Sequence, residues 1–419
     1  MKTNLLDAGD GVLTQLQLLE WLSEQTKEWG IANQKILLIV PDQTRTAPLG
    51  VLFKAFCELW LDSAAQMDVL IALGTHPPMT EEAIEQRLEI SRKERLTSYG
   101  KVRFFNHVWD DPTQLRTVGH LTGDVVSEIT DGLFSLDVAV SISSRIFDYD
   151  QIVIMGPVYP HEVVGFSAGN KYLFPGISGA EITNFFHWLG AIVTNPEIIG
   201  KAYTPVRAVV DRAASFVQMP KRCFCMVTNH EGDLAAVSAG TPEEAWEAAW
   251  PLAEKFHVSF KPKPFHTILS CAPEMYDELW VAGKCMYKLE PILADGGELI
   301  IYAPHLSKIS DTHGELIRST GYHCRDFFLK QWEKYKQIPW GVLAHCTHVY
   351  GGGTYDLESG LETPRARVTL ASQIPEAVCK ELNLGYRDPA SLSVQEYAGR
   401  EDEGVLLVPR AGEMLFRIG

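Results

Sequence analysis

Three side chains that could do chemistry are grouped in one short stretch of the chain. Lys171 follows His161 by ten residues, and His187 follows Lys171 by sixteen. Glycine-rich segments lie on both sides of the lysine, at 165–169 and 175–179. Because glycine lets backbone N–H groups approach an anion closely, a lysine between two such segments could hold a phosphate or bond covalently to a cofactor. The imidazole of His187 could then bind a metal.

Polar side chains also follow two predicted strands. Asp42 and Arg45 come after a strand expected at residues 35–40, and His76 comes after one expected at 68–73. An arginine suits a carboxylate or a phosphate, and a histidine titrates near neutral pH as a general base must. Each also has a structural interpretation. Asp42 and Arg45 could pair within a turn, and His76 could be a hydrogen-bonded loop residue.

The other candidates can be interpreted in two ways as well. His161 follows a further predicted strand, so it is a second candidate base. Lys171 could be a surface lysine, and Lys284 could be an ordinary lysine on a helix surface or part of a cleft near a domain junction. His187 stands among aromatic residues, company that is more typical of a core histidine than of a ligand. The pair His345 and His348 would be a weak metal motif without a helix or a third ligand, and it suits a substrate pocket better.

Strand-like runs alternate with helical patterns, which predicts an α/β fold with mainly parallel sheets. The expected strands are 35–40, 68–73, 102–106, 137–141, 151–155, 266–270 and 298–302. The expected helices are 51–60, 180–189 and about 275–293, with Thr80 as the N-cap of another. In open α/β sheets ligands gather at the carboxyl ends of strands, where these polar residues lie.

The length of 419 residues predicts two domains. A proline-rich stretch at 260–265 suggests a linker, so we expect an N-terminal domain at 1–260 with the candidate histidines and a C-terminal domain at 261–419. The net charge of −16 argues against a nucleic-acid partner. We see no signal peptide and no membrane span. The scattered cysteines fit reduced thiols, so we expect a cytoplasmic protein.

Taken in order, these segments resemble the nickel-pincer lactate racemase family. The resemblance extends from about Lys35 to Asp356, and the spacing around Lys171 is its most specific part. The residues that carry it are Asp42, Thr44, Arg45, Gly74, Thr75, His76, His161, Lys171, His187 and Lys284.

The resemblance implies two α/β domains with the active site between them. It also implies a nickel-pincer nucleotide, the pyridinium-3,5-bisthiocarboxylic acid mononucleotide of nickel, which separate biosynthetic enzymes must supply. Lys171 would bind this cofactor covalently through a thioamide, and His187 would be a ligand of the nickel, for which a square-planar site is suitable. Segments containing Ser167, Gly169 and Ser178 are the candidates for holding its phosphate.

The implied reaction is racemisation or epimerisation of a 2-hydroxy acid by reversible hydride transfer to the cofactor. His76 and His161 would be the acid and base on opposite sides of the reacting carbon. Arg45 and Lys284 would bind the substrate carboxylate, and Asp42 would orient Arg45 or contact the cofactor.

One departure from the family concerns the substrate. Characterised lactate enzymes have a glutamine three residues before the equivalent of Lys284, and here that residue is Val281. An apolar side chain cannot replace an amide hydrogen bond, so we expect an aldonate or a similar sugar acid rather than lactate. Two alternatives stay open: a zinc- or iron-dependent hydrolase that uses His76, His161 and His187, and a non-catalytic nucleotide-binding homologue.

Overall fold

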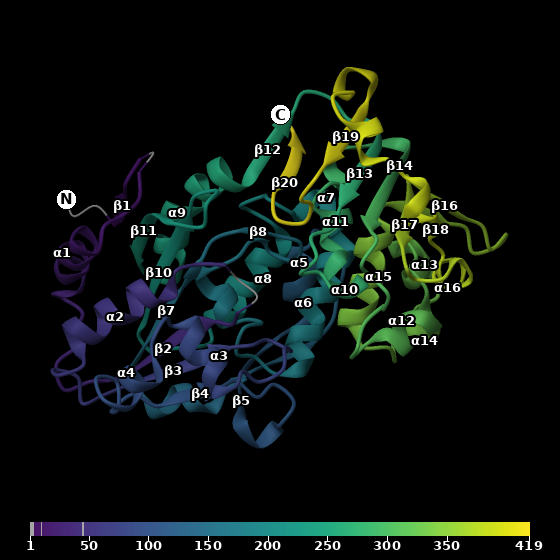
Figure 1. Ribbon diagram of the computed structural model, residues 1–419. Coiled ribbons are helices and arrows are strands. Elements are labelled where there is room, and N and C mark those ends of the chain that lie inside the picture. Colours follow the sequence, from purple (N-terminus) through teal and green to yellow (C-terminus); the bar gives the residue numbers. More distant parts are fainter. Residues whose placement is uncertain (1–3, 10, 44–45) are drawn as a thin grey trace. The chain divides into compact units, whose positions relative to one another are not determined.

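The computed structural model describes residues 4–9, 11–43 and 46–419 of the chain (Figure 1). The chain forms two compact units, each built from separate segments. Unit 1 contains Met1–Pro160, Phe166–Thr183 and Pro205–Phe256. Unit 2 contains His161–Gly165, Asn184–Thr204 and His257–Gly419. The chain passes from unit 1 to unit 2 for the last time at His257, which is close to the expected boundary at 260. Two earlier segments of unit 2, 161–165 and 184–204, interrupt the N-terminal half. The division into domains at 1–260 and 261–419 stays a prediction.

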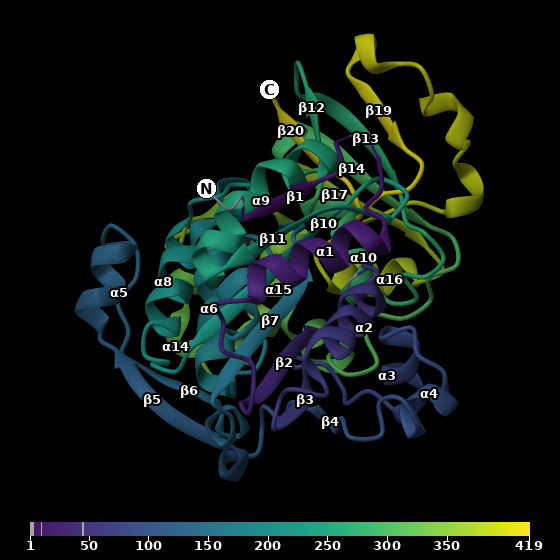
Figure 2. The same ribbon diagram turned by 90° about the vertical axis from the view of Figure 1, so that its left-hand side faces the viewer.

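Unit 1 is built on a seven-stranded sheet with the order β1-β11-β10-β7-β2-β3-β4 (Figure 2). Its strands are β1 (Leu5–Asp7), β2 (Lys35–Pro41), β3 (Gln66–Ala72), β4 (Phe104–Asn106), β7 (Gln151–Pro157), β10 (Lys221–Thr228) and β11 (Leu234–Gly240). Every neighbouring pair from β10 to β4 is parallel. Only the pairs that involve β11 are antiparallel. The mainly parallel α/β fold is therefore confirmed for this unit.

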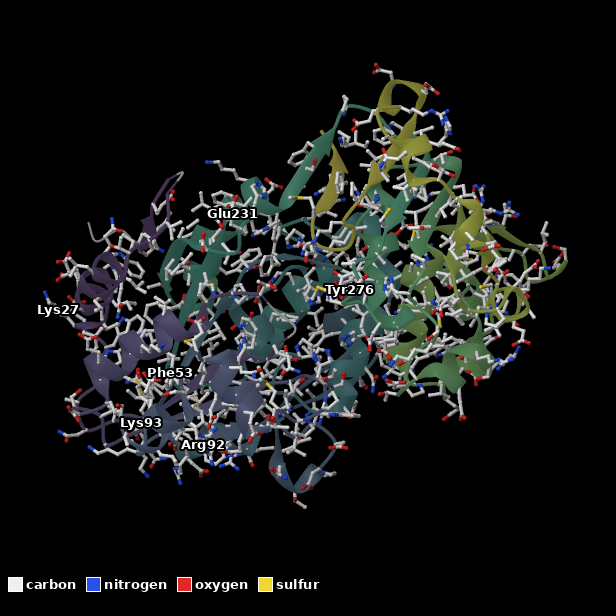
Figure 3. The ribbon with its side chains drawn as sticks, viewed as in Figure 1. Lys27, Phe53, Arg92, Lys93, Glu231 and Tyr276 are labelled. Atoms are coloured by element: carbon white, nitrogen blue, oxygen red, sulfur yellow. The ribbon has the colours of Figure 1, made fainter. Side chains whose placement is uncertain are left out.

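Most helices of this unit bury apolar residues along one face. Those of unit 1 are α1 (Gln15–Thr26), α2 (Leu49–Trp60), α3 (Glu81–Arg87), α4 (Arg92–Leu96), α5 (Gly123–Ile129) and α8 (Pro205–Ala214). A further helix, α9 (Pro242–His257), ends at the change of unit. Phe53 on α2 is fully buried, whereas Lys93 on α4 is exposed (Figure 3). As predicted, the Thr80 side chain caps α3 by accepting the Ala83 N–H.

One predicted strand lies outside the parallel sheet. The strand expected at 137–141 is β6 (Val138–Ser143), and it pairs antiparallel with β5 (Leu115–Leu121), which the periodicity did not indicate. Six of the seven β5 residues are exposed or only partly buried, so this strand lacks the continuous apolar run that marks a central strand.

Unit 2 contains a second parallel sheet, with the order β18-β17-β14-β13-β19. Its strands are β13 (Phe265–Cys271), β14 (Leu293–Ala303), β17 (Arg367–Ser372), β18 (Gly385–Tyr386) and β19 (Val405–Val408). Two smaller pairs complete it, β12 (Val258–Lys261) with β20 (Leu415–Ile418) and β15 (Gly353–Tyr355) with β16 (Glu362–Pro364). The helices are α7 (Asn195–Ile198), α12 (Gly314–Thr320), α13 (Arg325–Lys330), α14 (Trp332–Tyr335), α15 (Trp340–Tyr350) and α16 (Glu376–Glu381).

Two expectations for this half were wrong. The helix expected at about 275–293 is divided into α10 (Leu279–Ala282), α11 (Lys284–Tyr287) and a 3-10 turn at Glu290–Ile292. Pro291 lies in that turn, where a continuous helix would need its missing N–H. The expected linker at 260–265 overlaps β12 and β13, so only residues 262–264 lie between these strands. Two of the three are the prolines, which end strands because they cannot donate a ladder hydrogen bond.

Helix α6 (Ala180–Val193) carries the chain from unit 1 into unit 2 at residue 184. It contains the predicted helix at 180–189 and with it His187. Among the helices of the described residues, none is both long and apolar enough to cross a membrane.

Candidate functional site

The loops after β2 and β3 bring Asp42 and His76 together in unit 1. The two strands are parallel neighbours whose last residues, Pro41 and Ala72, are paired in register, so the loops start side by side. His76 Nδ1 lies 2.5 Å from Asp42 Oδ2. Asp42 is 5% exposed, while the side chain of His76 is 49% exposed. A carboxylate can only accept here, so Nδ1 carries the proton and the neutral ring keeps a lone pair on the outward Nε2.

Arg87 holds the loop that contains Asp42, a role that the sequence did not reveal. Its Nε donates to Pro41 O at 3.3 Å and its Nη1 donates to Ala47 O at 2.9 Å, at the two ends of the loop. Burial lowers the pKa of Arg87, while the nearby Tyr172 and Asp42 raise it. The predicted carboxylate-binding Arg45 belongs to this loop and lies outside the described residues. The only available signal for Arg87 was its position at the end of a helix with a recognisable cap.

Lys171 is a partly exposed residue in a loop of unit 1 whose other residues are buried. It lies in the 3-10 turn Gly169–Tyr172, which follows β9 (Gly165–Phe166). From residue 163 to residue 179, all of which are described, Lys171 is the one residue that is not buried. The loop after this turn also contacts the loop of His76, because Gly74 N–H donates to Gly176 O at 2.9 Å. The candidate lysine and the Asp42–His76 pair are therefore joined through one hydrogen-bonded backbone.

Buried polar contacts fix the turn below Lys171. The amide of Asn170 donates to Asp211 Oδ1 at 2.9 Å and to Glu243 Oε1 at 2.6 Å. Burial raises the pKa of Asp211, and the buried guanidinium of Arg207 opposes this rise. Arg207 also donates to Ala168 O at 3.3 Å. These groups reach the turn from α8 and α9, so the position of Lys171 is set by elements distant in sequence.

The predicted phosphate-binding residues beside Lys171 make hydrogen bonds within unit 1. Ser167 Oγ donates to Pro157 O and accepts the Tyr159 N–H, both at 2.9 Å. Ser178 Oγ lies 2.9 Å from Thr183 Oγ1. Both hydroxyls are fully buried. Gly169, also buried, has φ +60°, and a Cβ there would lie 3.1 Å from Pro242 O. The contribution of Ser167, Gly169 and Ser178 to phosphate binding stays a prediction, and it would fall to their backbone N–H groups.

His161 and Glu162 lie at the beginning of unit 2. His161 ends the short strand β8 (Pro160–His161) and is 5% exposed. The Val163 N–H donates to His161 Nδ1 at 3.1 Å. The same nitrogen lies 3.6 Å from Glu162 Oε2. The carboxylate also acts on His345 and His348, whose pKa values it raises against the effect of burial.

His187 is accessible although its neighbours are not. From residue 185 to residue 192 every other side chain is buried, and His187 alone is partly exposed. This differs from the fully buried core histidine that its aromatic neighbours suggested. Burial lowers the pKa of His348, and the charge of a protonated His187 lowers it further.

His345 and His348 lie on a helix, contrary to the sequence-based expectation. Both belong to α15, three residues apart, and both are buried. Burial lowers the pKa of His345 to about 3 and that of His348 to about 4, so both rings are neutral at physiological pH. The Trp280 ring lies 4.3 Å from the His345 ring.

Lys284 begins α11 beside this histidine pair. A Cβ at the preceding Gly283 would lie 3.1 Å from His345 Cε1, so α11 and α15 pack closely here. The Lys284 Nζ lies 5.4 Å from the centre of the Tyr276 ring. The residue at the family's glutamine position, Val281, is on α10 and is partly buried. Unit 2 therefore groups Lys284 with the histidines of α15.

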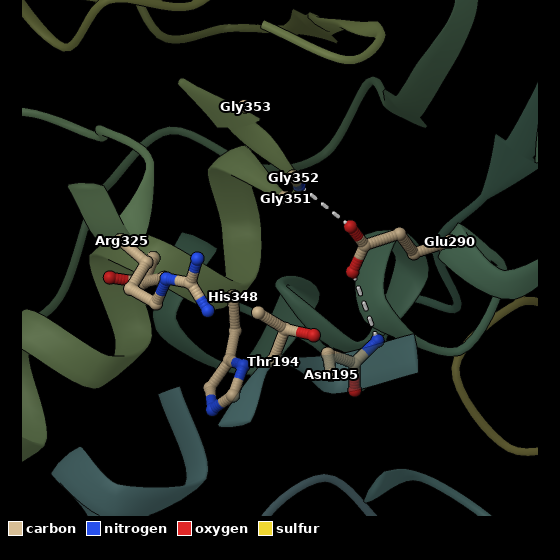
Figure 4. Close-up of a pocket in the computed structure, with 9 residues that line it drawn as sticks. Thr194, Asn195, Glu290, Arg325, His348, Gly351, Gly352 and Gly353 are labelled. Carbon is tan, nitrogen blue, oxygen red and sulfur yellow. Dashed lines mark hydrogen bonds between the residues drawn. The ribbon is translucent and has the colours of Figure 1, made fainter. Parts of the chain in front are cut away.

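A small polar cavity of ≈ 40 Å³ lies inside unit 2 beside His348 (Figure 4). Its lining is Thr194, Asn195, Glu290, Arg325, Thr347, His348, Gly351, Gly352 and Gly353. Glu290 Oε2 accepts from the Asn195 amide at 3.1 Å, and Glu290 Oε1 accepts the Gly352 N–H at 2.8 Å. Asn195 Oδ1 and His348 Nε2 find no hydrogen-bond partner among the described residues. A polar cavity of this size is large enough for water or a small hydroxyl group.

The described residues of the two units contain no three-ligand metal site. Over residues 4–9, 11–43 and 46–419, no group of three or more His, Cys, Asp or Glu side chains is arranged to hold a metal ion. A single imidazole such as that of His187 is compatible with a metal whose other ligands come from a cofactor.

Comparisons with known proteins agree with this architecture. Residues 19–198 match the model of the lactate racemase N-terminal domain. The chain is similar to a structural-genomics protein from Thermotoga maritima, with 32% identity, a TM-score of 0.85, and coverage of 99% of this chain and 100% of that one. It also has the fold of the lactate racemase apoprotein from Thermoanaerobacterium thermosaccharolyticum, with 16% identity, a TM-score of 0.73, and coverage of 98% and 95%. No curated protein matches the chain.

Proposed function

Because the chain belongs to a lactate racemase-like family, we propose that it is an isomerase that inverts C2 of a 2-hydroxy acid. The observation that carries this proposal is the presentation of Lys171. One amine emerges from a run of seventeen residues, 163–179, that is otherwise buried. A covalent attachment point needs a reachable amine on a fixed backbone, whereas a surface lysine would have exposed neighbours.

The residues present fit a nickel-pincer nucleotide. Lys171 would hold it through a thioamide, and the partly exposed imidazole of His187 would be the protein ligand of its nickel. When bound, this group supplies a reversible acceptor for the hydride of the substrate. Enzymes that make the cofactor would have to load it, since the chain offers only the attachment points.

The chain's own contribution is to move a proton and hold the substrate. His76 has the outward lone pair on Nε2 that a general base needs, and Asp42 fixes the ring in that tautomer. His161 is the second acid or base, because the hydroxyl points to opposite sides in the two stereoisomers. Lys284 and Arg45 would bind the substrate carboxylate through charge-assisted hydrogen bonds.

A 2-hydroxy acid with additional hydroxyls, such as an aldonate, is the proposed substrate class. Val281 offers no hydrogen bond where lactate enzymes have an amide. The cavity beside His348 supports a more polar substrate, since Asn195 Oδ1 and His348 Nε2 could pair with a hydroxyl. This hypothesis is independent of the reaction type.

The alternatives have less support. A zinc or iron hydrolase would give the partly exposed Lys171 no role, and no three-ligand cluster occurs in the described residues. A protein that only binds nucleotides would not need the short Asp42–His76 hydrogen bond.

The test begins with protein co-produced with the enzymes that make the cofactor. It is incubated with 2-hydroxy acids and aldonates that carry deuterium at C2. We expect epimerisation with the deuterium retained, because hydride returns to the same carbon. Loss of deuterium to water would contradict hydride transfer, and zinc without a covalent adduct would favour a hydrolase.

Intact mass provides the second test. We expect an adduct on the wild-type chain that Lys171→Ala abolishes. The matched control is Lys201→Ala, because Lys201 is also partly buried but forms an ordinary ion pair with Glu197 at 2.6 Å. An adduct that survives Lys171→Ala would place the attachment elsewhere.

A further inference from the structure

The two candidate acid–base histidines are held in opposite tautomers. His76 Nδ1 faces a carboxylate at 2.5 Å and must carry the proton, which leaves the lone pair on Nε2. His161 Nδ1 accepts the Val163 N–H at 3.1 Å, so its lone pair is already used and the neutral ring carries its proton on Nε2. His76 is thus ready to accept a proton on Nε2, and His161 is not.

His161 must leave the Nε2–H tautomer before it can act as a general base or a general acid. As a base it needs the lone pair on Nε2, which places its proton on Nδ1. As an acid it is an imidazolium and carries a proton on both nitrogens. In either working state Nδ1–H needs an acceptor, and the Val163 N–H cannot serve because it is itself a donor.

Glu162 is placed to be that acceptor. Its Oε2 lies 3.6 Å from His161 Nδ1, just beyond hydrogen-bond distance, and its side chain is 24% exposed. The neighbouring imidazoles of His345 and His348 are buried and neutral. A small rotation of the His161 ring or of Glu162 would exchange the bond from Val163 for one to the carboxylate.

We propose that Glu162 is a positioning residue that switches His161 from the resting Nε2–H tautomer to the working form with Nδ1–H. The proton leaves Nε2 and reaches Nδ1 through solvent, so neither the charge nor the number of protons on the neutral ring changes. The effect of Glu162 on catalysis rests on the proposed function. The resting tautomer of His161 does not depend on that function.

The experiment uses the full chain without cofactor, with histidine labelled with ¹⁵N in the ring. Long-range ¹H–¹⁵N correlation shows which ring nitrogen carries the proton. The His161 and His76 signals, two among 13 histidines, are assigned from their loss in His161→Gln and His76→Gln. We expect mainly Nε2–H for His161 and Nδ1–H for His76.

The role of Glu162 is tested with Glu162→Gln, which keeps the shape of the side chain and removes its charge. The Nδ1 signal of His161 should move further toward that of a pure acceptor, because the carboxylate no longer favours Nδ1–H. The control Glu358→Gln changes an exposed glutamate of the same unit and should leave His161 unchanged. A wild-type His161 with Nδ1–H only, or ring signals that Glu162→Gln leaves in place, would overturn the proposal.

Loaded enzyme gives the second readout. Glu162→Gln should lower kcat by about 10–100-fold with little change in KM, as loss of a group that orients a catalytic imidazole does. Unchanged kcat would also overturn the proposal. If the tautomers are as expected and no substrate is epimerised, the proposed function fails and the assignment of the tautomers stands.

Discussion

At the scale of single residues, one carboxylate determines what His76 can do. Asp42 is almost fully buried and His76 is half exposed, so the ring is anchored on the protein side and open on the other. The same arrangement orients the imidazole in hydrolytic triads, where the carboxylate selects the tautomer and stabilises the positive ring. The pairing could be anticipated from sequence only as two loops at neighbouring strand ends.

Asp42→Asn should therefore act through the tautomer of His76. An amide that donates to Nδ1 would force the proton onto Nε2 and remove the lone pair needed there. We expect kcat/KM to fall by about 10²–10⁴-fold in loaded enzyme. The control is Asp62→Asn, which changes a fully exposed aspartate of the same unit. An equal effect of the two changes would mean that Asp42 does not orient His76.

His107 makes the stability of the protein depend on pH. It is 2% exposed, its Nε2 lies 2.9 Å from Ser178 O, and burial lowers its pKa from 6.5 to about 4. The folded ring stays neutral while the unfolded ring takes up a proton, so acid favours the unfolded chain. The loss begins near pH 6.5 and is complete near pH 4.

We expect the wild-type chain to lose about 2 kcal/mol more unfolding free energy than His107→Gln between about pH 7.5 and about pH 5. Urea unfolding at the two pH values measures this difference. The other buried histidines are present in both proteins, so their effect cancels. Parallel pH dependence of the two curves would show that His107 titrates normally in the folded state.

At the scale of elements, the sequence predicted several strands and helices that have a clear run or period of apolar residues. β2, β3, β7, α2 and α6 were all predicted within a few residues. The helix expected at 275–293 failed because an apolar run can also be broken into short turns around a proline. The helical setting of His345 and His348 was missed because α15 is buried on all sides and has little amphipathic pattern.

The candidate site, too, could be predicted from the sequence only in part. Asp42 and His76 could be placed at strand ends, and Lys171 between glycines, from the sequence alone. The contacts that fix them could not, because they come from residues far along the chain. Arg87 holds the Asp42 loop and Asp211 holds the turn of Lys171, and no local pattern reveals either contact.

The turn that presents Lys171 depends on Gly169. Its φ of +60° is unfavourable for other residues, and an added Cβ would also crowd Pro242 O at 3.1 Å. We expect Gly169→Ala to cost about 2–3 kcal/mol of unfolding free energy. Gly399→Ala is the matched control, because it has φ +70° with nothing within 4 Å of the added Cβ. Equal losses would mean that the crowding at Gly169 is relieved without cost.

At the scale of the whole molecule, unit 2 is not continuous in sequence. Its segment 184–204 forms hydrogen bonds with residues that lie much later in the sequence. The Asn195 amide donates to Tyr287 O at 2.7 Å, Arg325 donates to Ile192 O at 3.0 Å, and Arg417 donates to Gly200 O at 2.8 Å. These bonds, like the buried core around them, need both parts of the chain.

A cut at residue 260 should therefore not give two independent domains. We expect the fragments 1–260 and 261–419 to aggregate or to lack cooperative unfolding when each is made alone, and co-expression to recover a folded complex. Circular dichroism and thermal melting of each sample measure this. A cut at the exposed turn 357–361 is the control and should be tolerated. A fragment 261–419 that folds alone would show that segment 184–204 is dispensable for unit 2.

The pairing of β12 with β20 has a consequence for how the protein is made. β20 ends at Ile418, one residue before the last, and its partner β12 is the first strand of the C-terminal segment. On the ribosome, unit 1 can begin to fold as its strands emerge, but unit 2 must wait until β20 has been made. Until then the apolar segment 184–204 has no partner and is exposed to chaperones and proteases. A nonsense or frameshift change that removes β20 should thus be as damaging to yield as a much earlier one.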